Sequence, residues 1–125
     1  MDEDNRKRPQ TRGQKRAKEA YKCVNLVAVK KDDYLQIAKK FPALVQACGL
    51  AQALAFVEAK EGATGTSYVE HLARVVGWVD KKGKAIGDLG KEARASDLMR
   101  YQRLTIEAIE SATWLKRYSE ALMED

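Results

Sequence analysis

The chain has 125 residues, which allows one hydrophobic core and is too short for two independently cored domains. Apolar residues make up 45% of it and charged residues 33%, and only eight glycines and two prolines interrupt it, a composition typical of a globular protein with long helices. The longest apolar stretch, residues 47–57, is shorter than the roughly 20 residues of a membrane span and contains Gln52, which excludes a membrane-spanning protein.

The net charge of +5 is unevenly distributed along the chain. Residues 1–22 hold eight Lys or Arg against four Asp or Glu, so the remainder is close to neutral. Within that remainder, residues 80–103 carry seven basic and four acidic side chains, whereas residues 104–125 carry two and five. A surface for nucleic acid would therefore occupy one face of the molecule rather than all of it.

Residues 1–13 (MDEDNRKRPQTRG) contain no apolar side chain apart from Met1 and Pro9, and so have nothing to bury. We predict that they form a mobile basic arm and that residues 14–125 form a single helical domain. The charged start lacks the apolar segment of a signal peptide, and we expect a cytoplasmic protein.

Two helices are predicted next along the chain. From Gln14 to Ala28, small and apolar residues recur at spacings of three and four, the pattern of one helix face. Asp32 or Asp33 can cap a second, short helix over residues 34–40. Pro42 then favours the start of a third helix, because proline suits a first turn and disfavours helical geometry in the residue before it.

The third predicted helix, residues 43–60 (ALVQACGLAQALAFVEAK), is apolar on nearly every side, which indicates the central helix of a bundle. Gly49 in its interior would let a neighbouring helix approach closely. We expect Leu50, Leu54 and Phe56 to be buried there.

The second half of the chain is predicted to hold two more helices. Residues 61–66 (EGATGT) are expected to form a loop that ends at Ser67, which would make a capping box with Glu70 and begin a helix that stops near Gly83. Residues 83–95 are expected to be irregular, with one short turn of helix, before Ser96 and Asp97 cap a last helix of about 26 residues. The fold class is therefore all-α, a compact single-domain bundle of five or more helices with a long C-terminal helix and no sheet.

The last predicted helix has a core side and an aromatic, basic side. The core side consists of Leu98, Tyr101, Leu104, Thr105, Ala108, Ile109, Ala112, Leu115 and Leu122. On the opposite side, Trp114 and Tyr118 interleave with Arg100, Arg103, Glu107 and Arg117. Two large aromatic residues in that position indicate a covered face, and either another chain or another part of this chain covers it.

The sequence offers few residues for catalysis or metal binding. His71 is the single histidine, so no second histidine stands at the spacing of a metal-binding pair. Cys23 and Cys48 lack metal-ligand spacing and a disulfide-rich context, and we interpret them as packed thiols rather than as part of a dyad of Cys48 with His71. We expect no enzyme activity, no metal and no cofactor.

Four segments occur in a distinctive order: TRGQKRAKEAYKCV (11–24), YLQIAKKFPALVQACGLAQALAFVEAK (34–60), SYVEHLARVVGWV (67–79) and LMRYQRLTIEAIESATWLKRYSEALM (98–123). The most specific residues are Pro42, Gly49, Leu50, Gln52, Ala53, Leu54, Phe56, Tyr101, Arg103, Thr105, Glu107, Ala108, Trp114, Leu115, Lys116 and Glu120. Over nearly the whole chain, this arrangement resembles the small helical subunit family of the Cmr-type (type III-B) CRISPR complex, an RNA-guided, RNA-targeting machine.

The resemblance implies a bundle that stacks with copies of itself beside backbone subunits that hold the guide RNA, while nuclease and cyclase activities belong to other subunits. The implied partners are the backbone and large subunits, further copies of this chain, and guide and target RNA. We expect a non-catalytic subunit in antiviral defence that contacts RNA phosphates without sequence preference. The alternative is a small interaction or regulatory module that docks a protein helix on the face of Trp114, Arg117 and Tyr118.

Two basic regions are candidates for the RNA-binding surface. The first would form if the segment before the last helix folds back on it, and consists of Lys81, Lys82, Lys84, Lys91, Arg94, Arg100 and Arg103. The second consists of Lys15, Arg16, Lys18, Lys39 and Lys40. Each of these residues could equally be part of an ordinary solvated helix face.

Overall fold

The computed structural model describes residues 9–28 and 30–124, so most of the predicted arm, residues 1–8, lies outside the described residues. The described residues form six helices and no strand. The helices are α2 (Arg12–Leu26), α3 (Lys31–Cys48), α4 (Leu50–Lys60), α5 (Gly62–Val76), α6 (Leu89–Ala95) and α7 (Leu98–Met123). The predicted all-α bundle with a long C-terminal helix is confirmed.

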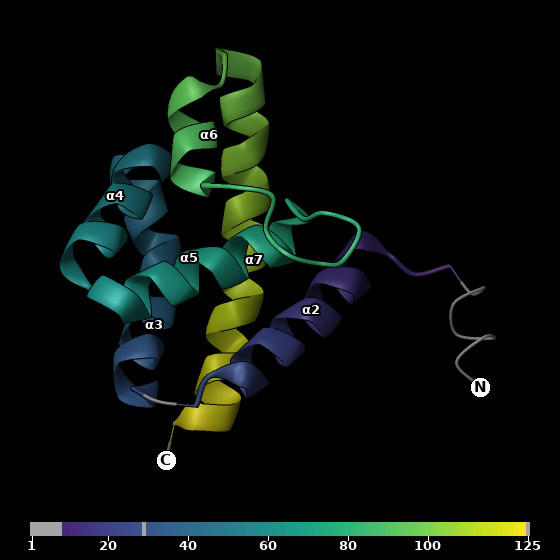
Figure 1. The fold of residues 1–125 in the computed structure, drawn as a ribbon, viewed down its shortest axis with the longest axis vertical. Coiled ribbons are helices and arrows are strands. Elements are labelled where there is room, and N and C mark those ends of the chain that lie inside the picture. The colour runs from purple at the N-terminus through teal and green to yellow at the C-terminus, as the bar shows by residue number, and fades with distance from the viewer. Residues whose placement is uncertain (1–8, 29, 125) are drawn as a thin grey trace.

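The last helix, α7, is the axis of the bundle. Figure 1 shows it along the long dimension of the molecule, with α3 packed on one side, α2 crossing on another and α5 lying across the middle. Asp97 caps its start by accepting a hydrogen bond from the backbone N–H of Arg100, and the helix runs for the 26 residues expected. None of the described helices is long and apolar enough to cross a membrane.

Buried side chains from α3, α4, α5 and α7 meet in one core. Aromatic rings occupy its centre, where Tyr68 of α5 packs at 5.6 Å from Tyr34 and 5.3 Å from Phe41, both of α3. Leu54 of α4 and Leu115 of α7 are fully buried in the same cluster. The core thus joins elements from both halves of the sequence.

The predicted helix start at Pro42 is wrong, because α3 runs through this proline without a break. Proline removes one backbone hydrogen bond and disfavours helical geometry at the preceding residue. Ile37, Phe41 and Val45 stand four residues apart and are all buried. These three side chains lie on one face only if the helix continues through Pro42. We therefore attribute the unbroken helix to their burial in the core.

The single central helix predicted over residues 43–60 is divided at Gly49, which separates α3 from α4. Gly49 has a φ of 88°, a conformation that side chains disfavour. A Cβ atom there would also lie 3.3 Å from the hydroxyl of Tyr101, which accepts a hydrogen bond from the backbone N–H of Ala51. Glycine therefore serves a turn between two helices at this position, and not close packing within one.

The predicted loop over residues 61–66 and the capping box at Ser67 are also wrong, because α5 already begins at Gly62. Gly65 is buried inside the first turns of α5, and a Cβ atom on it would clash with the carbonyl oxygen of Val57 in α4. The glycine allows these two helices to approach each other. The helix ends at Gly77, in the left-handed conformation, six residues before the predicted stop at Gly83.

Three residues predicted to face the core are exposed. The exposed fraction is 41% for Phe56, 70% for Leu98 and 46% for Leu122. The centre of the predicted core side of α7 is confirmed, since Leu104, Ala108, Ala112 and Leu115 are buried, whereas Leu98 and Leu122 near its two ends are exposed.

Candidate nucleic-acid interface

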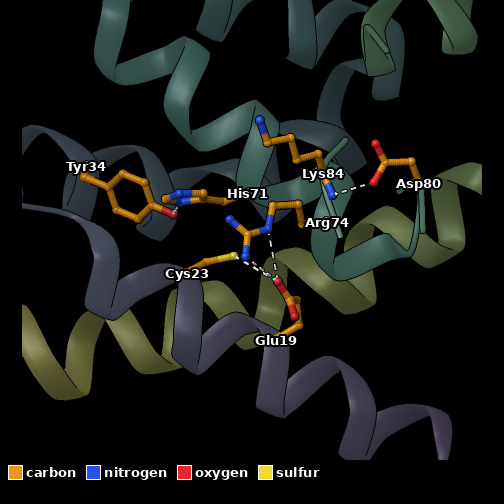
Figure 2. Close-up of polar contacts among 7 residues, drawn as sticks. All are labelled: Glu19, Cys23, Tyr34, His71, Arg74, Asp80 and Lys84. Atoms are coloured by element: carbon orange, nitrogen blue, oxygen red, sulfur yellow. Dashed lines mark hydrogen bonds and ion pairs between the residues drawn. The ribbon is translucent and has the colours of Figure 1, made fainter. Parts of the chain in front are cut away.

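Residues 77–86 between α5 and α6 form a small, ordered hairpin that carries three lysines. Val79 and Ala85 form an isolated antiparallel bridge. The carboxylate of Asp80 accepts hydrogen bonds from the backbone N–H groups of Lys82 at 2.8 Å and of Lys84 at 3.1 Å, and Figure 2 shows the bond from Lys84. Lys81, Lys82 and Lys84 are exposed, so a fixed turn presents three ammonium groups to solvent.

The base of this hairpin lies against the start of α7, as the first candidate region requires. The guanidinium of Arg100 lies 5.7 Å from the ring centroid of Trp78 and donates to Glu92 across 3.2 Å. Arg103 stands one helical turn further on, is exposed and forms no ion pair with a described residue. The base of the hairpin that carries the three lysines therefore lies on the part of α7 that contains Arg100 and Arg103.

The two basic residues of α6 are exposed but do not share one environment. Arg94 lies on the side of α6 that faces α4, because its guanidinium and the carboxylate of Glu58 both lie against Gly90. Burial and Asp88 raise the pKa of Glu58, and Arg94 lowers it. Lys91 is exposed and forms no ion pair with a described residue. Arg94 thus lies beside an acidic neighbour.

The five residues of the second candidate region fall into two groups, those with an acidic partner and those without one among the described residues. Arg16 is only 6% exposed and is bound to Glu110 of α7 across 2.7 Å, so it serves the packing of α2 on α7. Lys39 is bound to Glu124 across 2.7 Å and Lys40 to Glu61 across 2.9 Å. Lys15 and Lys18 are exposed on α2 and form no ion pair with a described residue.

Arg12, which lies within the predicted arm, belongs to α2 in the structure. It is exposed in the first turn of α2, which begins there because Thr11 and Gln14 form a capping box. One surface hollow contains both Arg12 and Arg103, and another contains Arg12 and Lys15. Arg12 therefore links the two candidate regions, and the spacing of Thr11 and Gln14 is the sequence signal that could have placed it on the helix.

The face of Trp114 is covered mainly by α2 of the same chain. The rings of Trp114 and Tyr118 are stacked with centroids 5.8 Å apart, and Tyr118 meets the edge of Tyr21 of α2 at 5.4 Å. Beside them, a hollow between the start of α2 and α7 is lined by Arg12, Gly13, Arg16, Glu110, Trp114 and Arg117, among others. Part of the predicted interface therefore remains open to solvent.

A partly buried polar cluster joins α2, α3 and α5 (Figure 2). Arg74 donates twice to Glu19, at 2.8 and 3.0 Å, and the thiol of Cys23 lies 3.8 Å from the same carboxylate. His71 and Tyr34 share a hydrogen bond of 2.7 Å. The pKa of His71 is lowered to about 4 by burial and by Arg74, which outweigh Glu19, so the imidazole is neutral at pH 7.

This cluster provides no arrangement for nucleophilic catalysis. Burial raises the pKa of Cys23 to about 12, which keeps its thiol protonated. Cys48 is exposed at the end of α3 and donates to the carbonyl of Leu44, while His71 is engaged by Tyr34. Across residues 9–28 and 30–124, no group of three or more His, Cys, Asp or Glu side chains could hold a metal ion.

A protein family, a curated relative and a solved structure are each similar to this chain over most of its length. Residues 12–122 match a family described as CRISPR-associated protein (Cas_Cmr5). The chain is 37% identical over 117 residues to the CRISPR system Cmr subunit Cmr5 of Thermus thermophilus, and the match covers 92% of this chain and 98% of that relative.

The fold is similar to a crystal structure of a CRISPR-associated Cmr5 family protein, also from Thermus thermophilus. The TM-score is 0.80 at 36% identity, and the match covers 93% of this chain and 100% of the other. The residues matched by the family run from the first residue of α2 to the last turn of α7. The similarity thus includes the elements that carry the basic surface.

Proposed function

Because the chain belongs to the Cmr5 family of CRISPR-associated proteins, we propose that it is a non-catalytic structural subunit of a type III-B Cmr complex in the cytoplasm that contacts guide or target RNA for antiviral defence. Its RNA contacts are made to phosphates and carry no base information, since lysine and arginine bind the backbone of any sequence alike.

The observation that carries this proposal is the division of the basic side chains into paired and unpaired groups. Arg16, Lys39, Lys40 and Arg100 each have an acidic partner. By contrast, seven exposed cations on the first half of α2, on the hairpin and on α7 form no ion pair with a described residue, namely Arg12, Lys15, Lys18, Lys81, Lys82, Lys84 and Arg103. We call this set the basic edge. Other exposed cations that form no ion pair with a described residue, such as Lys30, Lys31 and Lys60, lie at the start of α3 and the end of α4. Uncompensated cations on one part of a surface favour binding to a polyanion.

The proposed protein partners are the backbone subunit, the large subunit and further copies of this chain. Support comes from α7, where Leu98, Met99 and Ile106 have exposed fractions of 70%, 78% and 60%. Such apolar side chains on the surface of one helix are typical of a face that another chain covers. The assignment as non-catalytic is supported by His71 and Cys23, both of which are engaged inside the bundle.

The test is RNA binding by a reconstituted Cmr complex in which Lys81, Lys82 and Arg103 are all changed to Glu. We expect weaker binding of target RNA and a shallower dependence of the logarithm of affinity on the logarithm of salt concentration, by a little under about one for each lost phosphate contact. The matched control changes Lys30, Lys31 and Lys60 to Glu, three exposed residues outside the basic edge. Equal effects of the two sets would contradict the proposal.

A further inference from the structure

The hollow between the start of α2 and α7 combines an aromatic ring with arginines that have no acidic partner. We infer that it accepts one unpaired base of a single-stranded RNA, stacked on the indole of Trp114, with the adjoining phosphates on Arg12 and Arg117. This inference rests on the proposed function, because it specifies how the end of the basic edge at Arg12 would hold RNA.

The charge of the hollow favours a polyanion. Three arginines line it, together with the single acidic residue Glu110. Glu110 is bound to Arg16 across 2.7 Å, and Glu107 lies 3.9 Å from the same guanidinium, so Arg16 is compensated. Arg12 and Arg117 are exposed and form no ion pair with a described residue. Two positive charges therefore remain for a ligand.

The indole is held in place before any ligand arrives. Trp114 is half-buried and its ring stacks on Tyr118 at an interplanar angle of 20°. Tyr118 in turn meets Tyr21 of α2 edge to face. A ring that already stacks on a neighbour loses little conformational freedom when a base stacks on it, which strengthens binding.

The hollow has room for a base because of Gly13. This residue lies in the first turn of α2 and lines the hollow, and a Cβ atom on it would meet only the hydroxyl of Thr11, at 3.8 Å. A larger side chain at this position would project into the space without removing a charge. Among the described residues of the lining, Ile109 is the one aliphatic side chain and stands beside three arginines, so the hollow combines an aromatic ring with positive charge.

The first experiment uses fluorescence of the full chain in a Trp78→Phe background, which leaves Trp114 as the only tryptophan. A single-stranded oligouridylate should quench Trp114, whereas inorganic polyphosphate, which offers the charge without bases, should not. Absence of quenching by the oligouridylate, or equal quenching by polyphosphate, would overturn the inference.

The second experiment measures target-RNA affinity of the reconstituted complex with Gly13→Leu. We expect about a tenfold loss of affinity with an unchanged salt dependence, because stacking is lost and the charges remain. The matched control is Gln36→Leu, an exposed position of α3 away from the hollow, and thermal melting of both variants establishes that they fold.

The outcomes separate the inference from the proposed function. If Gly13→Leu leaves affinity unchanged while reversal of Lys81, Lys82 and Arg103 lowers it, the stacking site is wrong and the proposed function stands. If neither set changes affinity, both are wrong. A third outcome is that the Gly13→Leu variant fails to assemble into the complex, although the isolated variant binds the oligouridylate as well as the unaltered chain does. The hollow would then receive a protein segment, which also overturns the inference.

Discussion

Arg16 of α2 and Glu110 of α7 form an ion pair of 2.7 Å that joins the first described helix to the last. Only 6% of the arginine side chain is exposed, whereas 54% of the glutamate is, so the pair lies at the edge of the core. A cation in this position stabilises the bundle and is not free to bind a phosphate.

The first prediction follows from this pair. Arg16→Ala should lower the free energy of unfolding by about 1–3 kcal/mol, because a charged hydrogen bond is lost and the aliphatic stem no longer packs on α7. Urea denaturation measures it. Lys15→Ala is the control, since Lys15 is exposed and unpaired and should change stability by no more than about 0.5 kcal/mol. Equal stabilities of the two variants would refute the structural role of Arg16.

The second prediction compares two residues of α4. Leu54→Ala should cost roughly 2–5 kcal/mol, because Leu54 is fully buried and its removal leaves a cavity. Phe56→Ala should cost clearly less, since the ring is 41% exposed and rests beneath the ammonium of Lys40, 5.4 Å from its centroid. Thermal denaturation of both variants measures the two losses of stability. A larger loss for Phe56→Ala than for Leu54→Ala would mean that the buried face of α4 contains Phe56 and not Leu54.

The sequence specifies the elements whose signals are local. The cap at Asp97, the length of α7 and the all-helical class were predictable from side-chain patterns alone. The incorrect predictions of helix boundaries occur where a contact between residues far apart in the sequence determines the local structure. Pro42 stays helical because its neighbours enter the core, and residue 65 is a glycine within α5 because α4 passes too close for a side chain.

For the candidate RNA-binding surface too, local features could be predicted from the sequence and distant contacts could not. The exposure of the lysines at positions 81, 82 and 84 could be expected from the polar pattern around them. The partners of Arg16, Lys39 and Lys40 stand 94, 85 and 21 residues away, and no local pattern reveals such pairs. Which cations are free to bind a phosphate is therefore a property of the fold.

The third prediction concerns the break between α3 and α4. The hydroxyl of Tyr101 accepts the backbone N–H of Ala51 across 3.0 Å, in the first turn of a helix that has no side-chain cap of its own. Tyr101→Phe should therefore destabilise the protein by about 1 kcal/mol. Hydrogen exchange at the amide of Ala51 should accelerate in this variant, and unchanged protection would contradict the assigned contact.

The fourth prediction concerns the two thiols. Cys23 is fully buried and its pKa is raised to about 12, whereas Cys48 is exposed. A thiol reagent at pH 7 should therefore label Cys48 in the native protein and reach Cys23 only after denaturation. Cys48→Ser is the control, which should show almost no native labelling. Rapid labelling of that variant would mean that α2 opens readily from the bundle.

The last prediction is a pH dependence of stability that originates at His71. The pKa of its imidazole is lowered to about 4 in the folded protein, first by burial and then by Arg74, while an unfolded chain titrates near about 6.5. Between these values the unfolded state binds more protons than the folded state. The free energy of unfolding should therefore decrease as the pH falls through this window, and the contribution of His71 should be fully present only above it.

At about 1.4 kcal/mol for each pKa unit, the loss attributable to His71 is of order 3 kcal/mol by pH 4. Acidic residues add their own pH dependence, so the measurement compares urea unfolding of the protein and of His71→Gln at about pH 7 and about pH 4.5. Glutamine does not titrate, although it loses part of the contact with Tyr34, and the variant should be less stable at about pH 7. Its stability should fall less than that of the parent protein on acidification. Parallel decreases for the two proteins would show that the imidazole is not held neutral in the fold.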